Sequence, residues 1–222
     1  MPNDHRITII CAAKDNVNFP TLSNHLNSLI VPPGYTVDLQ LLCGDFSATQ
    51  GRNLGLRNSD AKYKIYLDPH VTIANPNLIG EALRLFQTYP QLGLLGVIGA
   101  KQLPANGNWR EAPARYGSIA YLGQPLLFHE VAGDYEPVQV VDGMMMITQF
   151  DLIWSENLFS DYFYDSAYCL EFQKAGYQVG IPKQLTPWCA YHHPGDTIFQ
   201  FYRERDKFID EYRQLLPQLL PK

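Results

Sequence analysis

Short apolar runs separated by polar segments fill the first hundred residues. Four of these runs, rich in β-branched and aliphatic side chains, predict buried strands over residues 6–12, 36–43, 62–68 and 92–100. Between them lie segments that predict helices, over residues 20–30, 53–58 and 75–89. The last of these begins with Asn75 and Pro76, a pair that suits a helix cap and a first turn. Such an alternation of strands and helices predicts a mainly parallel sheet with helices on its faces.

The pattern changes after residue 100. Residues 101–137 are rich in Gly, Pro and aromatic side chains without a clear period, which predicts loops with short strands. Regular segments then return: a strand over 138–148 broken at Asp142-Gly143, a helix over 165–175, a strand over 178–182 and an amphipathic helix over 197–216. We therefore expect a single α/β domain over residues 1–222. Its two halves would be residues 1–100 and 101–196, with a C-terminal helix over 197–222.

Composition and charge are those of an ordinary globular chain. It has 222 residues, of which 46% are hydrophobic and 18% charged, enough for one full-sized core. A net charge of −5 argues against nucleic acid as a partner. No apolar run reaches the ~20 residues that cross a bilayer, and no signal peptide is evident, so we expect a cytoplasmic protein. Peripheral membrane contact is compatible with this. The four scattered cysteines are expected to be buried, reduced thiols.

Polar side chains follow each of the first three predicted strands. They are Asp15, Asp45, Arg52, Asn53, Asp68 and His70. Ligands bind outside the carboxyl ends of parallel strands, so these residues would share one crevice. Neither a P-loop nor a G-x-G-x-x-G motif is present, and bound phosphate would therefore need a cation. Mn²⁺ or Mg²⁺ suits a diphosphate, and the Asp-x-His pair within YLDPHVTI is a chemically sensible ligand pair for it.

The ordered set of motifs resembles the nucleotide-sugar-dependent family-2 glycosyltransferases of the GT-A fold. It includes an R-N-x-G segment at residues 52–55, then a strand that ends in Asp-x-His where the family has Asp-x-Asp. VDGMMMIT at 141–148 and WCAYHHPG at 188–195 are similar to later family segments. FYD, which ends at Asp165, stands ten residues before the Ala-Gly-Tyr segment. The resemblance covers most of the chain and is strongest to small bacterial members with FYD at the base position.

This resemblance implies an enzyme that moves a sugar, expected from a UDP-sugar, to a glycan or glycolipid acceptor with inversion. Its setting would be bacterial surface polysaccharide assembly. Asp165 would be the general base. Asp68, His70 and His192 would hold the divalent cation. The full set of expected substrate-binding residues is Ala12, Asp15, Asp45, Arg52, Asn53, Asp68, Trp109, Asp142 and Gly143.

The sequence departs from the family pattern near both acidic motifs. His70 replaces the second Asp of Asp-x-Asp, and Pro69 occupies its middle position. Tyr164 precedes the expected base where Glu is common, and Ala167 stands where a second acid often follows. Two rival functions therefore stay open: a module that binds a nucleotide sugar without transferring it, and a nucleotidyltransferase. The second would be expected to carry a glycine-rich loop after the first strand.

Plainer structural roles are open for the same residues. Asp68 and His70 could simply end a strand in a turn, and Asp165 could cap a helix. His192 could be a surface histidine. Arg52 and Asn53 could cap and solvate a short helix, and Trp109 could be loop core rather than a platform for an acceptor sugar.

Overall fold

The structure is a computed structural model that describes residues 2–14, 23–24, 26–156, 159, 162–192 and 198–217. The helix predicted over residues 20–30 therefore lies partly outside the described residues. Within these ranges, no helix is both long and apolar enough to cross a membrane.

The main sheet has seven strands in the described part of the chain, in the order β2-β1-β3-β11-β5-β12-β9. Their bounds are β1 Asn3–Ala13, β2 Thr36–Cys43, β3 Ala61–Leu67, β5 Leu92–Gly96, β9 Tyr135–Val138, β11 Met145–Thr148 and β12 Gln178–Pro182. β11 and β9 run antiparallel to their neighbours, and the other strands share one direction. The prediction of a mainly parallel α/β sheet is thus confirmed. Because β11 and β12 lie among strands of the first half, the two predicted halves share one sheet.

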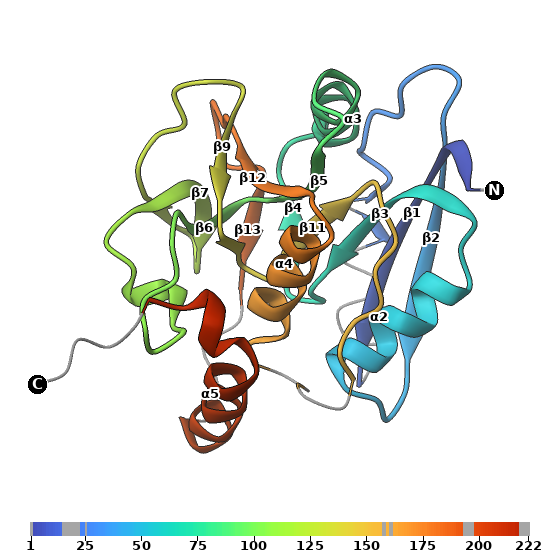
Figure 1. Cartoon of the computed structure of the whole chain (residues 1–222). Coiled ribbons are helices and arrows are strands. Elements are labelled where there is room, and N and C mark those ends of the chain that lie inside the picture. Colours follow the sequence, from blue (N-terminus) through green and yellow to red (C-terminus); the bar gives the residue numbers. More distant parts are fainter. Residues whose placement is uncertain are drawn as a thin grey trace, which may run out of the picture.

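Helices cover both faces of this sheet, as Figure 1 shows. They are α2 (Ala48–Arg57), α3 (Leu78–Thr88) and α4 (Tyr164–Lys174), whereas α5 (Ile198–Tyr212) lies away from the sheet, at the bottom of Figure 1. Alternate residues of β3 identify the two faces, because successive side chains of a strand point in opposite directions. Tyr63 stacks on Phe86 of α3, whereas Tyr66 meets Tyr168 of α4 edge to face. α3 and α4 therefore lie on opposite faces.

A second, smaller sheet packs beside the first, on the left in Figure 1, in the order β10-β6-β7-β13-β4 with β8 paired to β7. Its strands are β4 Val71–Ile73, β6 Ile98–Ala100, β7 Arg115–Tyr121, β8 Gln124–Leu127, β10 Val140–Val141 and β13 Cys189–Tyr191. Two short 3-10 turns, η1 (Trp109–Glu111) and η2 (Arg213–Leu215), complete the described elements. The single strand predicted over 92–100 was wrong, because this run divides between the two sheets as β5 and β6. The break predicted at Asp142-Gly143 within 138–148 is present, since β10 ends at Val141 in the second sheet and β11 begins at Met145 in the first. Gly96 and Gly99 permit the division, since a Cβ at either position would overlap Val140 or Val141.

Two helix starts also differ from the prediction. α2 begins earlier than expected because Ser47 and Gln50 form a reciprocal capping box. α3 begins later, at Leu78, because Asn75 closes a turn instead of capping the helix. Its Oδ1 accepts a hydrogen bond from the N–H of Asn77 at 2.9 Å.

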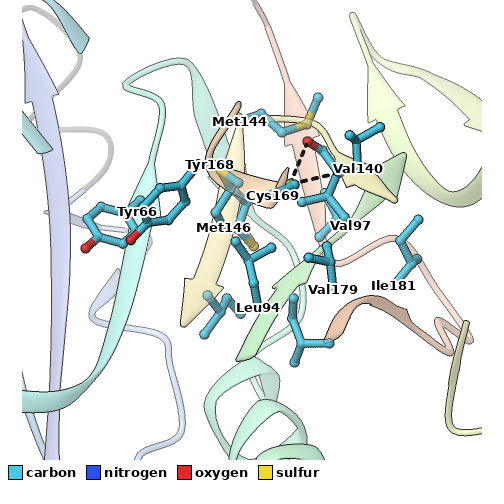
Figure 2. Close-up of a cluster of buried hydrophobic side chains, with 14 of the residues drawn as sticks. Tyr66, Leu94, Val97, Val140, Met144, Met146, Tyr168, Cys169, Val179 and Ile181 are labelled. Atoms are coloured by element: carbon cyan, nitrogen blue, oxygen red, sulfur yellow. Dashed lines mark hydrogen bonds between the residues drawn. The ribbon is translucent and has the colours of Figure 1, made fainter. Parts of the chain in front are cut away.

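A buried apolar cluster joins the two sheets to α4 (Figure 2). Met146 of β11 and Leu94 of β5 lie in the first sheet, and Val140 lies in the second. The Cys169 sulfur accepts a hydrogen bond from the Val141 N–H at 3.4 Å, so the helix is fixed to the second sheet as well. All four cysteines are free, and Cys43 is exposed where burial was expected.

Gly117 of β7 sets the path of the β7–β8 hairpin, and it has a φ of 92°. A Cβ there would overlap the carbonyl oxygen of Val97. We expect Gly117→Ala to lower the free energy of unfolding by about 2 to 4 kcal/mol, from left-handed strain together with steric overlap. Gly123→Ala is the control. Its φ is 79°, but nothing lies within 4 Å of its added Cβ, so strain alone should cost about 1 kcal/mol. Equal losses in urea unfolding would contradict this account.

Candidate active site

The topology brings three polar segments to one edge of the main sheet. β3 ends at Leu67, and the antiparallel partner β11 begins with Met145 opposite it. The N–H of Asp68 donates to the carbonyl of Met144 at 2.9 Å. Asp142 and Gly143, which precede β11, therefore lie at the carboxyl end of β3. The first turn of α4 lies there too, because the N–H of Gly143 donates to Asp165 in that turn.

A cavity of about 370 Å³ opens at this edge. Its walls include five predicted residues: Asp68, His70, Trp109, Asp142 and Asp165. A larger cavity of about 660 Å³ adjoins it and shares Trp109 and Asp142. Of the six polar residues predicted to share one crevice, Asp68 and His70 line this cavity, and most of its other walls come from the second half of the chain.

Asp165 lies in the first turn of α4 and is 8% exposed. Its Oδ2 accepts a hydrogen bond from the Gly143 N–H at 3.0 Å, and its Oδ1 accepts one from the Ser166 N–H at 2.7 Å. Phe163, with a left-handed φ of 57°, occupies the cap position of the helix instead. The capping role considered for Asp165 is therefore not the one found. Its carboxylate faces the cavity and is anchored to the segment before β11.

Burial, and after it the neighbouring Asp142 carboxylate, raise the pKa of Asp165 to about 6. The Arg110 guanidinium and the backbone N–H groups of Ser166 and Gly143 lower this pKa. A carboxyl group with this pKa is mostly ionised at neutral pH. It also holds a proton more strongly than an ordinary aspartate does, which is the balance that a general base needs.

Asp142 is held from both sides. Its Oδ2 accepts a hydrogen bond from Nη2 of Arg110 at 2.9 Å, and its Oδ1 accepts one from the Met144 N–H at 3.0 Å. The buried carboxylate therefore fixes the turn that carries Gly143. It also places a negative charge and its arginine partner on the cavity wall.

Asp68 and His70 belong to the turn that follows β3, and both also line the smaller cavity. Asp68 Oδ1 accepts a hydrogen bond from the backbone N–H of His70 at 2.8 Å, and it lies 2.9 Å from His70 Nδ1. The backbone N–H of His192 donates to the His70 carbonyl at 3.2 Å, which continues the β4–β13 pairing. The structure thus places the backbone of His192 next to that of His70. Among the described residues, no group of three or more His, Cys, Asp or Glu is placed to hold a metal ion.

Arg52 and Asn53 lie outside the lining of the cavity. The Arg52 guanidinium is buried between the rings of Trp154 and Tyr164, at 4.7 and 4.4 Å, and its Nη2 donates to the Gly143 carbonyl at 2.8 Å. The Asn53 amide accepts from the Trp154 N–H and donates to the Trp154 carbonyl, each at 2.9 Å. We interpret both residues as supports for the loop before α4 rather than as substrate contacts.

The remaining expected residues differ in their positions. Asp15 lies outside the described residues. Ala12 packs against α2, where a Cβ on Gly51 would overlap it, and Asp45 is exposed in the loop after β2. Trp109 is 4% exposed and lines both cavities, so it belongs to the loop core and to the site.

Arg110, Arg115 and Tyr191 were not predicted, although each lines one or both cavities. The two arginines stand in the segment 101–137, where the sequence shows no period, so no pattern indicated the direction of their side chains. Tyr191 directly precedes His192, and the WCAYHHPG segment could have indicated it.

The layered α/β sheet, with its acidic cleft at the carboxyl strand ends, defines a GT-A-like protein. A family model described as "Glycosyltransferase like family" matches residues 8–212. The chain belongs to this family, which confirms the family and fold expected from the sequence. No curated protein matches the chain at a significant level.

Solved structures share the fold at low sequence identity. TarS of Staphylococcus aureus (residues 1–349) is 9% identical with a TM-score of 0.59, and the match covers 95% of this chain and 64% of TarS. The mannosyltransferase PcManGT from Pyrobaculum calidifontis, solved with GDP-Man and Mn²⁺, is 10% identical with a TM-score of 0.57, and covers 99% of this chain and 66% of that one. This chain therefore spans just under two thirds of each.

A third similar structure is a mutant of a Drosophila β-1,4-galactosyltransferase 7, in complex with manganese, UDP-Gal and xylobiose. It is 13% identical with a TM-score of 0.53, and the match covers 90% of this chain and 79% of that one. At these identities, the likeness shows the fold alone.

Proposed function

We propose that this chain transfers a sugar from a nucleoside-diphosphate sugar, most simply a UDP-sugar, to a hydroxyl group of a glycan or glycolipid acceptor. The observation that carries the proposal is Asp165. Its buried carboxylate has a raised pKa, lines the cavity and shares that cavity with Asp68 and His70. Structures of the same fold support the donor class, since TarS has been solved with UDP-GlcNAc and the galactosyltransferase with UDP-Gal.

Asp165 is proposed to act as the general base. The acceptor hydroxyl transfers its proton to the ionised carboxylate while its oxygen forms a bond to the anomeric carbon. The bond between that carbon and the diphosphate oxygen breaks, and the nucleoside diphosphate leaves with the electron pair. A single displacement of this kind inverts the anomeric configuration. The N–H groups of Gly143 and Ser166 keep the carboxylate oriented throughout.

Asp68 and His70 are the proposed ligands of a divalent cation, because Mn²⁺ accepts both a carboxylate oxygen and an imidazole nitrogen. Asp68 Oδ1 and His70 Nδ1 are 2.9 Å apart, and the backbone at His192 adjoins them. His70 would then bind through an unprotonated Nδ1, with phosphate oxygens and water as further ligands. When bound, such a cation offsets the charge of the leaving diphosphate.

We expect Asp165→Asn to lower kcat/KM for transfer by about 10²- to 10⁴-fold, because the proton acceptor is lost. The affinity for UDP should stay within about twofold. Released UDP measures turnover, and titration calorimetry measures UDP binding. In the wild type, kcat/KM should fall as the pH drops below about 6, where Asp165 takes up a proton. Asp210→Asn, on an exposed part of α5, is the control. Unchanged turnover of Asp165→Asn would disprove the assignment of the base.

The cation site can be tested through donor binding alone. We expect Mn²⁺ to raise the affinity for UDP about tenfold or more, since it adds charge compensation for the diphosphate. Asp68→Ala and His70→Ala should each abolish most of that gain in calorimetry. His5→Ala removes a histidine of β1 outside both cavities and should preserve it. An affinity for UDP that is the same with and without Mn²⁺ in the wild type would refute the role of both residues.

A further inference from the structure

The larger cavity, of about 660 Å³, has an aromatic wall, of which Tyr121 and Phe128 lie outside the smaller cavity proposed for the donor. Trp109, Tyr121, Phe128 and Tyr191 contribute to this wall from η1, β7, the end of β8 and β13. Because the cavity adjoins the one that contains Asp165, a sugar held here can present a hydroxyl group to the base. The C–H face of a pyranose ring packs well on such aromatic surfaces.

Arg115 brings a positive charge to this cavity without a matching carboxylate. Its guanidinium lies 4.7 Å from the centre of the Phe128 ring, and its Nη1 donates to the Arg110 carbonyl at 2.7 Å. Across the described ranges, no Asp or Glu forms an ion pair with Arg115, and its Nε and Nη2 groups have no hydrogen-bond partner. The ring and the carbonyl thus hold the guanidinium in place and leave two donors available.

The other charged groups of this cavity have partners. Arg110 pairs with Asp142 at 2.9 Å. Glu111 accepts hydrogen bonds from the side-chain amides of Asn106 and Asn108, each at 2.7 Å. Arg115 is therefore the arginine of this wall that forms no ion pair among the described residues.

We propose that this cavity binds an acidic sugar of the acceptor, whose carboxylate or phosphate pairs with Arg115. The inference rests on the proposed glycosyltransferase function and narrows its acceptor class. A planar guanidinium binds a carboxylate or a phosphate oxygen pair through two parallel hydrogen bonds. The aromatic wall around it lowers the local dielectric, which strengthens this pairing relative to water.

Ligand-observed NMR titrations with UDP and Mn²⁺ present test the proposal. The probes are methyl glucoside, methyl glucuronide, methyl galacturonide and methyl glucoside 6-phosphate. We expect at least one acidic probe to bind about tenfold or more tightly than the neutral glucoside. A preference for the uronides would identify a carboxylate, and a preference for the 6-phosphate would identify a phosphate.

Arg115→Gln should remove this preference, while Arg213→Gln should leave it intact. Arg213 is the matched control, because it carries the same charge on the surface of η2, where it pairs with Asp210. UDP binding, measured in the same samples, distinguishes a failure of the proposed glycosyltransferase function from a failure of the acidic-sugar proposal. If UDP does not bind to the wild type, the proposed function fails, and this inference fails with it. If UDP binds but acidic probes show no preference, or the preference survives Arg115→Gln, this inference alone is overturned.

Discussion

The hydrogen bond from the Gly143 N–H to the Asp165 carboxylate joins the two parts of the molecule on which the site depends. Gly143 belongs to the turn before β11, which lies inside the main sheet, and Asp165 belongs to the first turn of α4. The Gly143 carbonyl is held at the same time by the buried Arg52 guanidinium. A side chain at this position would place a Cβ 2.6 Å from the Tyr164 hydroxyl, so any residue other than glycine would require the Tyr164 ring to shift. The position of the carboxylate is thus set by the sheet as well as by its own helix.

Two carboxylates and two guanidinium groups surround this hydrogen bond. The Asp142 and Asp165 carboxylates are buried near one another, and Arg110 lies at Asp142 while Arg52 lies behind Gly143. Burial and the Asp142 charge raise the pKa of Asp165, and the Arg110 charge limits that rise. The result is a carboxyl group, our proposed base, that is mostly ionised at neutral pH and forms no direct ion pair among the described residues. An ion pair with Arg110 would lower the pKa of Asp165 and weaken it as a proton acceptor.

Strand order accounts for the positions of some of the residues that line the cavity. Asp68 and His70 end a parallel strand, and Asp142 precedes its antiparallel neighbour, so a simple topological rule places them at the cleft. Arg52 and Asn53 also follow a parallel strand, but α2 turns their side chains toward the loop around Trp154. The sequence shows that both residues follow the strand, but it does not show which way their side chains point from α2.

Arg110 and Arg115 were beyond prediction for a different reason. They lie in η1 and β7, and the second sheet that positions them is built from strands of two to seven residues. Such short strands carry almost no periodic signal, and their pairing partners are distant in the sequence. The division of the run at 92–100 between the two sheets was not predicted for the same reason, since its apolar residues suit a buried strand in either sheet.

A crystal structure of the chain with UDP and Mn²⁺ tests the central claim most directly. The account predicts UDP in the cavity of about 370 Å³, with Mn²⁺ between its diphosphate and the side chains of Asp68 and His70. The Asp165 carboxylate should remain on the Gly143 N–H and face open space toward the larger cavity. UDP bound elsewhere, or Mn²⁺ held without Asp68 and His70, would contradict it.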